Sequence, residues 1–166
     1  MRKLRVYLDT SVINFLYADD APEKRDITRE FFARRLHVYE VSISDVVLFE
    51  IASTKDEGKL RLLVEAVKTY NLSAVPMDQG ETEEVNGIVA EYLRARVFPE
   101  RKREDALHVA ISTVFEFDVL LSWNFHHLAN ITKEIRINAL NERLGYLKRL
   151  NIRTPLEVMG DETEGR

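Results

Sequence analysis

Three acidic residues, Asp9, Glu50 and Asp105, lie at positions where a carboxylate could take part in chemistry. Each adjoins an apolar run of the sequence, so each carboxylate is expected at or near the edge of a core. An unpartnered buried carboxylate costs several kcal/mol, roughly, and therefore needs a cation, a metal ion or a proton. The three acids are the first candidates for a metal site or for acid–base chemistry.

Asp9 follows the apolar residues 4–8 and precedes Thr10 and Ser11, at the point where a predicted strand passes into a helix. Sites in parallel sheets lie beyond the carboxyl ends of the strands, which is where Asp9 falls. The simpler interpretation is an N-cap, because an aspartate at that position accepts a backbone N–H of the new helix. These residues alone do not decide between the two.

Glu50 and Asp105 each have two interpretations as well. Glu50 lies in a helical run with few other charges, beside Phe49 and Ile51, so its carboxylate is either partnered at the buried stripe or reaches water from its edge. Asp105 begins the stretch 105–111, which is apolar nearly all the way round and typical of a central buried helix. An acid in that first turn either faces a cleft or complements the helix dipole.

Other polar residues near these acids also have both a structural and a functional interpretation. Ser122 and Asn124 follow the apolar strand residues 119–121 and share the edge of Asp9 if the strands are parallel. Asn124 can offer a neutral oxygen to a hard cation or simply form a turn. His108 lies three residues after Asp105 on the same helical face, but hard cations prefer oxygen ligands, so we expect a packed or water-facing histidine. Trp123 is expected to cover the core.

Short apolar strands alternate with helices along the chain. Strands are predicted at 4–8, 38–43, 73–77 and 118–122, with an edge strand or extended segment at 152–155. Helices are predicted at 12–17, 23–36, 44–52, 54–70, 78–97, 102–117 and 132–150, with a capping box from Thr54 to Glu57. This alternation favours an α/β fold in which helices cover both faces of a parallel sheet. One domain is predicted over residues 1–159, followed by a polar tail, 160–166, that is expected to be disordered.

Length and composition exclude several classes of protein. The 166 residues suit one domain, and the lack of cysteine rules out disulfides, thiolate zinc sites and cysteine nucleophiles. No window approaches the roughly 20 apolar residues of a membrane span, so a cytoplasmic protein without a membrane partner is expected. With 24 Lys and Arg against 28 Asp and Glu, the net charge is −4, which argues against nucleic-acid binding by bulk charge. A nuclease remains possible, because a metal ion and a local basic patch can meet phosphate.

The arrangement of acids resembles the PIN domain family of metal-dependent ribonucleases. The resemblance covers most of the chain and rests on YLDTSVINFL at 7–16, SDVVLFEIA at 44–52, EDALHVAIS at 104–112 and DVLLSWNFHHLAN at 118–130. It implies a three-layer α/β/α fold with a central, mainly parallel sheet whose carboxyl edge gathers the acids around Mg²⁺ or Mn²⁺. Asp9, Glu50 and Asp105 match the first three family acids. The family often has a fourth acid where this chain has Asn124, so we expect one tightly held ion rather than two.

The resemblance also assigns supporting positions. Thr10, Ser11 and Asn14 match polar residues that support the first acid, and Ser122 matches the small hydroxyl residue after the last core strand. With Asn124, these side chains would orient the metal ligands or the phosphate.

The implied function is a metal-dependent endoribonuclease. A metal ion held by Asp9 and Asp105 would polarise a phosphoryl oxygen and lower the pKa of a bound water, and Glu50 would hold the metal or take the proton of that water. The basic run of Arg101, Lys102 and Arg103 would contact the RNA backbone, or else is a solvated helix start. His126 and His127 lie near the predicted cleft and could contact substrate.

Two functions of other kinds remain open. A catalytically weak PIN-like module for RNA binding or protein interaction is one, and Asn124 at the position of the fourth family acid favours it. A phosphoacceptor or phosphatase-like domain also has an Asp after its first strand, but the phosphatase pattern requires a second Asp where Ser11 stands.

Expected partners follow from the resemblance. Many small PIN proteins are toxins of the VapC type, neutralised by an antitoxin and often dimeric. We therefore expect an RNA substrate, an antitoxin protein and a homodimer as partners, although the sequence does not separate a toxin from a housekeeping RNA-processing enzyme.

Overall fold

Four short strands form a parallel sheet in the computed structural model, which describes residues 2–160. The strands are β1 (Arg5–Leu8), β2 (Glu40–Ser42), β3 (Val119–Leu121) and β4 (Asn151–Arg153), in the spatial order β2-β1-β3-β4. Every pairing is parallel. Residues of the two inner strands, β1 and β3, are almost all buried, as a parallel sheet covered on both faces requires.

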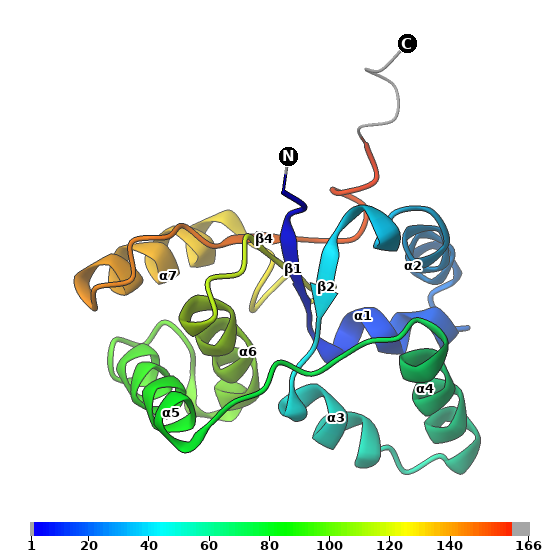
Figure 1. Cartoon of the computed structure of the whole chain (residues 1–166), viewed down its shortest axis with the longest axis horizontal. Coiled ribbons are helices and arrows are strands. Elements are labelled where there is room, and N and C mark those ends of the chain that lie inside the picture. The colour runs from blue at the N-terminus through cyan, green and yellow to red at the C-terminus, as the bar shows by residue number, and fades with distance from the viewer. Residues whose placement is uncertain (1, 161–166) are drawn as a thin grey trace.

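Helices lie on both sides of this sheet (Figure 1). In Figure 1, α1, α2 and α4 are seen on one side of the strands and α5, α6 and α7 on the other. The sequence prediction of an α/β fold with a parallel sheet between helical layers is therefore confirmed. The helices are α1 (Thr10–Asn14), α2 (Pro22–Arg34), α3 (Asp45–Ala52), α4 (Glu57–Thr69), α5 (Gln79–Arg94), α6 (Arg103–Val114) and α7 (Ile131–Arg143), with short 3-10 turns η1 (Phe15–Tyr17), η2 (Leu36–Val38) and η3 (Glu100–Lys102).

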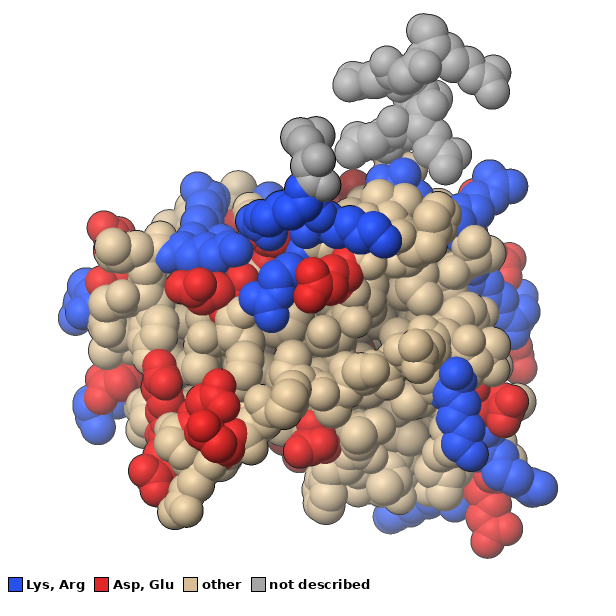
Figure 2. Space-filling model, in the orientation of Figure 1, with Lys and Arg blue, Asp and Glu red and all other residues tan. Residues whose placement is uncertain are grey.

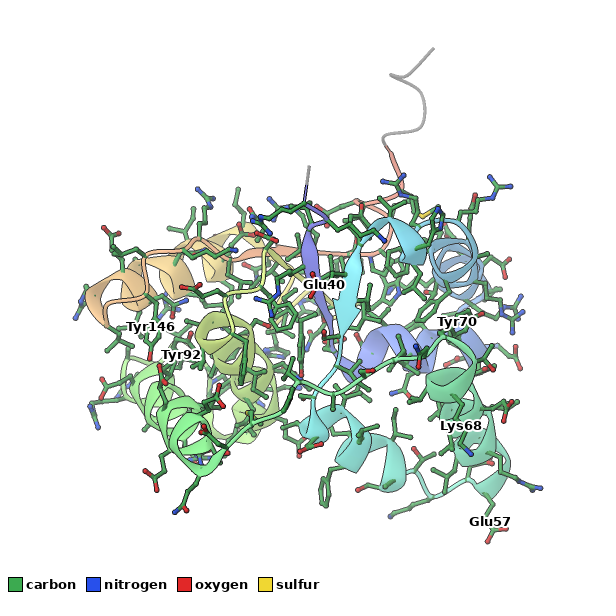
Figure 3. The ribbon with its side chains drawn as sticks, in the orientation of Figure 1. Glu40, Glu57, Lys68, Tyr70, Tyr92 and Tyr146 are labelled. Carbon is green, nitrogen blue, oxygen red and sulfur yellow. The ribbon has the colours of Figure 1, made fainter. Side chains whose placement is uncertain are left out.

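A buried tyrosine connects the helices α5, α6 and α7. The Tyr92 hydroxyl in α5 donates to Asn141 Oδ1 in α7 at 2.5 Å and lies 3.3 Å from Thr113 Oγ1 in α6. Asn141 Nδ2 in turn donates to Thr113 Oγ1 at 3.0 Å. Figure 3 shows Tyr92 among these helices. The Tyr92 hydroxyl has hydrogen-bond partners within this helical layer, so the residue can be buried without leaving a polar atom unsatisfied.

The amino edge of the sheet is held by Asp118, the residue before β3. One carboxylate oxygen accepts the backbone N–H of Arg5 at 2.8 Å and a guanidinium N–H of Arg2 at 2.9 Å, while Lys148 Nζ lies 2.9 Å from the other. The bonds from Arg2, with those from Arg5 and Lys148, hold the pKa of Asp118 far below its ordinary value, although burial acts in the opposite sense. Figure 2 shows Lys and Arg side chains gathered over this edge.

The predicted strand at 73–77 is wrong. Only one bridge forms, between Ala74 and Ile43, where the Ile43 N–H donates to Ser73 O and the Val75 N–H donates to Ile43 O. The ladder does not continue, because the chain after Ile43 leaves the sheet and begins α3 at Asp45, where the next pair of bonds would form. The segment therefore crosses the end of β2 instead of adding a strand to the sheet.

Several helices end earlier than the sequence predicts, among them the one expected at 78–97, which ends at Arg94, two residues before Arg96 at φ 57°. The helix expected at 132–150 ends at Arg143, because Gly145 adopts a left-handed φ of 96° and the chain turns back. The helix expected at 102–117 ends at Val114, two residues before Glu116 at φ 54°.

The expected helix starts have mixed outcomes. The N-cap of α4 is Asp56, which accepts from the Lys59 N–H, so the capping box predicted from Thr54 is wrong. A complete capping box forms instead at Asp78, with Glu81.

Two further expectations concern the chain's end and its hydropathy. The edge strand predicted at 152–155 is β4, while the tail predicted to be disordered lies outside the described residues from 161 onward. Among residues 2–160, no helix combines the length and apolar character needed to cross a membrane.

Candidate active site

Asp9 lies at the carboxyl end of β1 and is 3% exposed. It is the N-cap of α1, as its simpler interpretation predicted: Oδ1 accepts from the Val12 N–H at 3.4 Å and from the Ser11 hydroxyl at 2.5 Å. Burial raises the pKa of Asp9 above its ordinary value, although His108 and the hydroxyls of Ser11 and Ser122 lower it. No Lys or Arg within residues 2–160 forms an ion pair with it. The cap therefore leaves a buried carboxylate that no Lys or Arg of the described residues pairs with.

The loop after β3 is fixed against Asp9 through Ser11. The Ser11 hydroxyl donates to Asp9 and accepts the Trp123 backbone N–H at 2.9 Å, so one side chain joins the ends of the two inner strands. The Ser122 hydroxyl accepts the Asn124 backbone N–H at 2.9 Å and turns the chain after β3. The sequence placed Ser11 and Ser122 beside Asp9, and the structure brings them there.

Asp105 lies in the first turn of α6 and is held by Asn124. Asn124 Nδ2 donates to Asp105 Oδ2 at 3.1 Å, and Asn124 Oδ1 accepts the His127 backbone N–H at 3.1 Å. Asn124 thus forms a turn and also orients an acid, so its amide oxygen already has a partner. Burial raises the pKa of Asp105, while the neighbouring His108, Lys102 and His127 lower it.

Glu50, on α3, is bound by His108 rather than left free. Its Oε1 lies 2.7 Å from His108 Nε2, and His108 Nδ1 lies 2.7 Å from the Tyr7 hydroxyl, which is 2.7 Å from Ser44 Oγ. Burial lowers the pKa of His108, but the bond to Glu50 and the charges of Asp9 and the other acids outweigh it, so the pKa is raised. With both ring nitrogens occupied, His108 is the packed histidine that the sequence predicted and is not available as a metal ligand.

The three acids lie within electrostatic reach of one another. The charge of Asp105 raises the pKa of Asp9, and that of Glu50 raises the pKa of Asp105. However, the described residues contain no group of three or more acids and histidines drawn together as a ready-made metal site. The three acids differ in what holds them: Glu50 is bound to a histidine, whereas Asp9 and Asp105 are bound by neutral donors.

The remaining predicted site residues are less closely tied to the acids. Thr10 Oγ1 is buried with no hydrogen-bond partner among the described residues, and Asn14 forms no side-chain cap. Arg103 pairs with Glu100 at 2.6 Å on the surface, whereas Lys102 lies close enough to Asp105 to influence its pKa.

The aromatic and imidazole side chains of the loop after β3 differ in exposure. Trp123 is 5% exposed and its indole N–H donates to Thr28 Oγ1, so it covers the core as predicted. His126 is exposed and His127 is half-buried.

Tyr7 and Ser44 are the functional candidates that the sequence analysis missed. Tyr7 lies in a strand buried on both faces, where no alternation of polar and apolar residues marks the direction of a side chain. A tyrosine among aliphatic residues two positions before Asp9 was the available signal, because a buried hydroxyl requires a partner.

No family model and no curated protein matches this chain. Among solved structures, a similar chain occurs in the crystal structure of VapBC2 from Rickettsia felis bound to a DNA fragment from their promoter. The TM-score is 0.56 at 14% sequence identity, over 91% of this chain and 98% of the other. At this identity the similarity is one of fold, and it supports the α/β architecture over nearly the whole chain.

Proposed function

We propose that this protein is a metal-dependent endoribonuclease of the PIN type, with Asp9 and Asp105 as the metal ligands. One observation carries the proposal: at the carboxyl edge of a parallel sheet, the buried carboxylate of Asp9 and the partly buried carboxylate of Asp105 have no Lys or Arg ion pair among the described residues. Sites of parallel α/β sheets lie at this edge. Buried charges are normally paired or coordinate metals, so the lack of a Lys or Arg ion pair favours a bound cation.

The donor set fits a hard divalent cation such as Mg²⁺ or Mn²⁺. Carboxylate oxygens are the preferred ligands of these ions, and burial raises the pKa of both Asp9 and Asp105, a penalty that a nearby positive charge would offset. The hydroxyl of Thr10, the residue after Asp9, is a further buried polar atom that has no hydrogen-bond partner among the described residues. With Asn124 in place of a fourth acid, the set fits one ion.

Such an ion supplies Lewis acidity at a phosphoryl oxygen and a bound water of lowered pKa. The residues of the chain perform the remaining work. Ser11 holds Asp9, and Asn124 orients Asp105. Glu50 Oε2 has no hydrogen-bond partner among the described residues, which leaves it to accept the proton of the attacking water. Lys102, beside Asp105, is placed to contact an RNA phosphate.

A toxin role with an antitoxin partner is the more specific form of this proposal. It is supported by the resemblance of the sequence to small PIN toxins and by the fold shared with a chain of VapBC2, which was crystallised on a promoter DNA fragment. Co-expression with the product of a neighbouring small gene, followed by co-purification and loss of toxicity, would test it. The expected homodimer stays a prediction for sedimentation analysis.

Cleavage of a mixed single-stranded RNA pool is the test of the activity. We expect Mn²⁺-dependent cleavage that EDTA abolishes and that Asp9→Asn reduces to background. Asp20→Asn, the same change at an exposed aspartate, is the matched control and should cleave like the wild type. A matched single-stranded DNA pool tests the preference for RNA.

A second candidate is a PIN-like module that binds RNA or a protein with little catalysis. One observation favours it: Glu50 is bound by His108, and no three-acid metal group is present among the described residues. Retention of RNA by folded, Mn²⁺-loaded protein without any cleavage would select this candidate and reject the nuclease.

A further inference from the structure

The three elements that carry the acids also carry a second set of polar residues. Tyr7 precedes Asp9 on β1, Ser44 precedes Glu50 at the start of α3, and His108 follows Asp105 on α6. These residues form one line of hydrogen bonds, from Ser44 Oγ to the Tyr7 hydroxyl, to His108 Nδ1 and, through Nε2, to Glu50 Oε1, with every link 2.7 Å long.

This line of bonds is buried along most of its length. Ser44 and Tyr7 are fully buried and His108 is 2% exposed, whereas the Glu50 side chain is 23% exposed. The line therefore begins in the core beneath the sheet edge and ends at a carboxylate that reaches solvent. Buried polar groups in such a line rigidify their surroundings, because breaking one link leaves its neighbours unsatisfied.

The chemistry of the groups fixes the direction of the last bond. An ionised carboxylate only accepts, so His108 Nε2 carries the hydrogen donated to Glu50. When the imidazole is neutral, Nδ1 is then the acceptor, and the Tyr7 hydroxyl donates to it while accepting from Ser44. Tyr7 thus selects the tautomer that can hold Glu50, in the way that a buried partner orients a histidine in other sites.

We infer that His108, fixed by Tyr7 and Ser44, is a positioning residue that holds the Glu50 carboxylate in one orientation beside Asp9 and Asp105. One oxygen of Glu50 is occupied by His108, and the other is left for water. This inference rests on the proposed nuclease function and adds to it three residues with a defined task. It also gives Glu50 a role that differs from that of the two aspartates, since Glu50 is held by a histidine whereas Asp9 and Asp105 are held by neutral donors.

Two substitutions at position 108 separate the two bonds of the ring. Gln carries its side-chain N–H at about the depth of Nε2 and can still donate to Glu50, whereas Asn ends at about the depth of Nδ1 and reaches only toward Tyr7. We expect His108→Asn to lower kcat roughly 10- to 100-fold, the range typical when a group that orients a site residue is lost. His108→Gln should recover most of that loss. KM and the Kd for Mn²⁺ should change little in either variant.

Tyr7→Phe is the second variant, because it keeps the aromatic ring packed and removes only the hydroxyl. We expect kcat to fall about tenfold in this variant. His37→Asn, the same change at an exposed histidine, is the control and should behave like the wild type. Thermal unfolding of each variant separates a loss of positioning from a loss of folded protein.

Imidazole NMR gives a readout that does not depend on cleavage. In ¹⁵N-labelled protein, His108 should be protonated at Nε2, and Glu50→Gln should shift that resonance while Asp20→Asn should not. An unshifted resonance would overturn the inference, as would equal kcat values for His108→Asn and the wild type. Absence of cleavage by the wild type would instead reject the proposed function, and the NMR comparison would still decide whether His108 holds Glu50.

Discussion

Replacing Asp9 with Asn should make the metal-free protein more stable while removing its metal site. Asn keeps the shape of the side chain and is as good an N-cap as Asp, so the bond to the Val12 N–H survives. What disappears is a buried negative charge without a cationic partner, close to the charge of Asp105. We therefore expect Asp9→Asn to raise the free energy of unfolding in EDTA by about 1 kcal/mol, within the range of stabilising changes at functional sites.

Metal binding should reverse this order. A ligand present at 100 times its Kd stabilises the folded state by about 2.7 kcal/mol. For a domain of 166 residues, 1 kcal/mol corresponds to about 2 to 4 °C in Tm. The wild type should thus melt a few degrees below Asp9→Asn in EDTA and, because only the wild type binds the ion tightly, several degrees above it in saturating Mn²⁺.

Differential scanning calorimetry in EDTA and in Mn²⁺ measures both differences. Asp20→Asn, which removes an exposed charge, should match the wild type in each condition. If Asp9→Asn is less stable than the wild type in EDTA, the carboxylate serves chiefly as a helix cap. If the variant gains as much from Mn²⁺ as the wild type does, the ion binds elsewhere and the assignment of Asp9 and Asp105 as its ligands fails.

Three further predictions concern other parts of the molecule. Asp118→Asn should lower the free energy of unfolding at pH 7 by about 2 kcal/mol, since it weakens a buried charge-assisted bond to the Arg5 N–H. Because the folded pKa of Asp118 is depressed, this difference is complete above the unfolded pKa of about 4 and shrinks as the pH falls below it. Urea titrations at several pH values measure it. Asn124→Ala should reduce kcat about tenfold with little change in Tm, because Asp105 loses its orienting partner at the surface of the site; an unchanged kcat would contradict that role. Gly145→Ala should cost about 1 kcal/mol, measured by thermal unfolding, because φ at this position is 96° and no atom lies near enough to crowd the new methyl group.

The alternation of apolar runs with helical periods was sufficient to predict the fold class, because parallel strands and their crossover helices leave separate marks in the sequence. It failed at 73–77, where a short apolar run resembles a strand but forms one bridge only, because its partner chain turns into α3 after Ile43. The periodicity also did not predict that α7 ends at Arg143, because the left-handed backbone conformation of Gly145 is a local feature that helical periodicity does not reveal.

The candidate site was predicted only in part. The positions of Asp9 and Asp105 follow from strand ends and helix starts, which the sequence marks. The line from Tyr7 through His108 to Glu50 depends on which way side chains point inside a buried layer, and a strand buried on both faces does not indicate that direction. Whether the three carboxylates share one ion stays a prediction.

The hydrogen-bond line through Tyr7, Ser44 and His108 has a consequence for how this protein can evolve. A change at one of these positions leaves a buried polar atom unsatisfied at the next, at a cost of about 1 to 3 kcal/mol, which is a large part of the stability of a typical domain. The three positions are therefore expected to vary together among relatives of this chain: where phenylalanine replaces Tyr7, the residue at position 108 should no longer be histidine. Tyr7, Ser44 and His108 would then be retained or lost together in evolution, whereas Asp9 and Asp105 do not depend on these three residues.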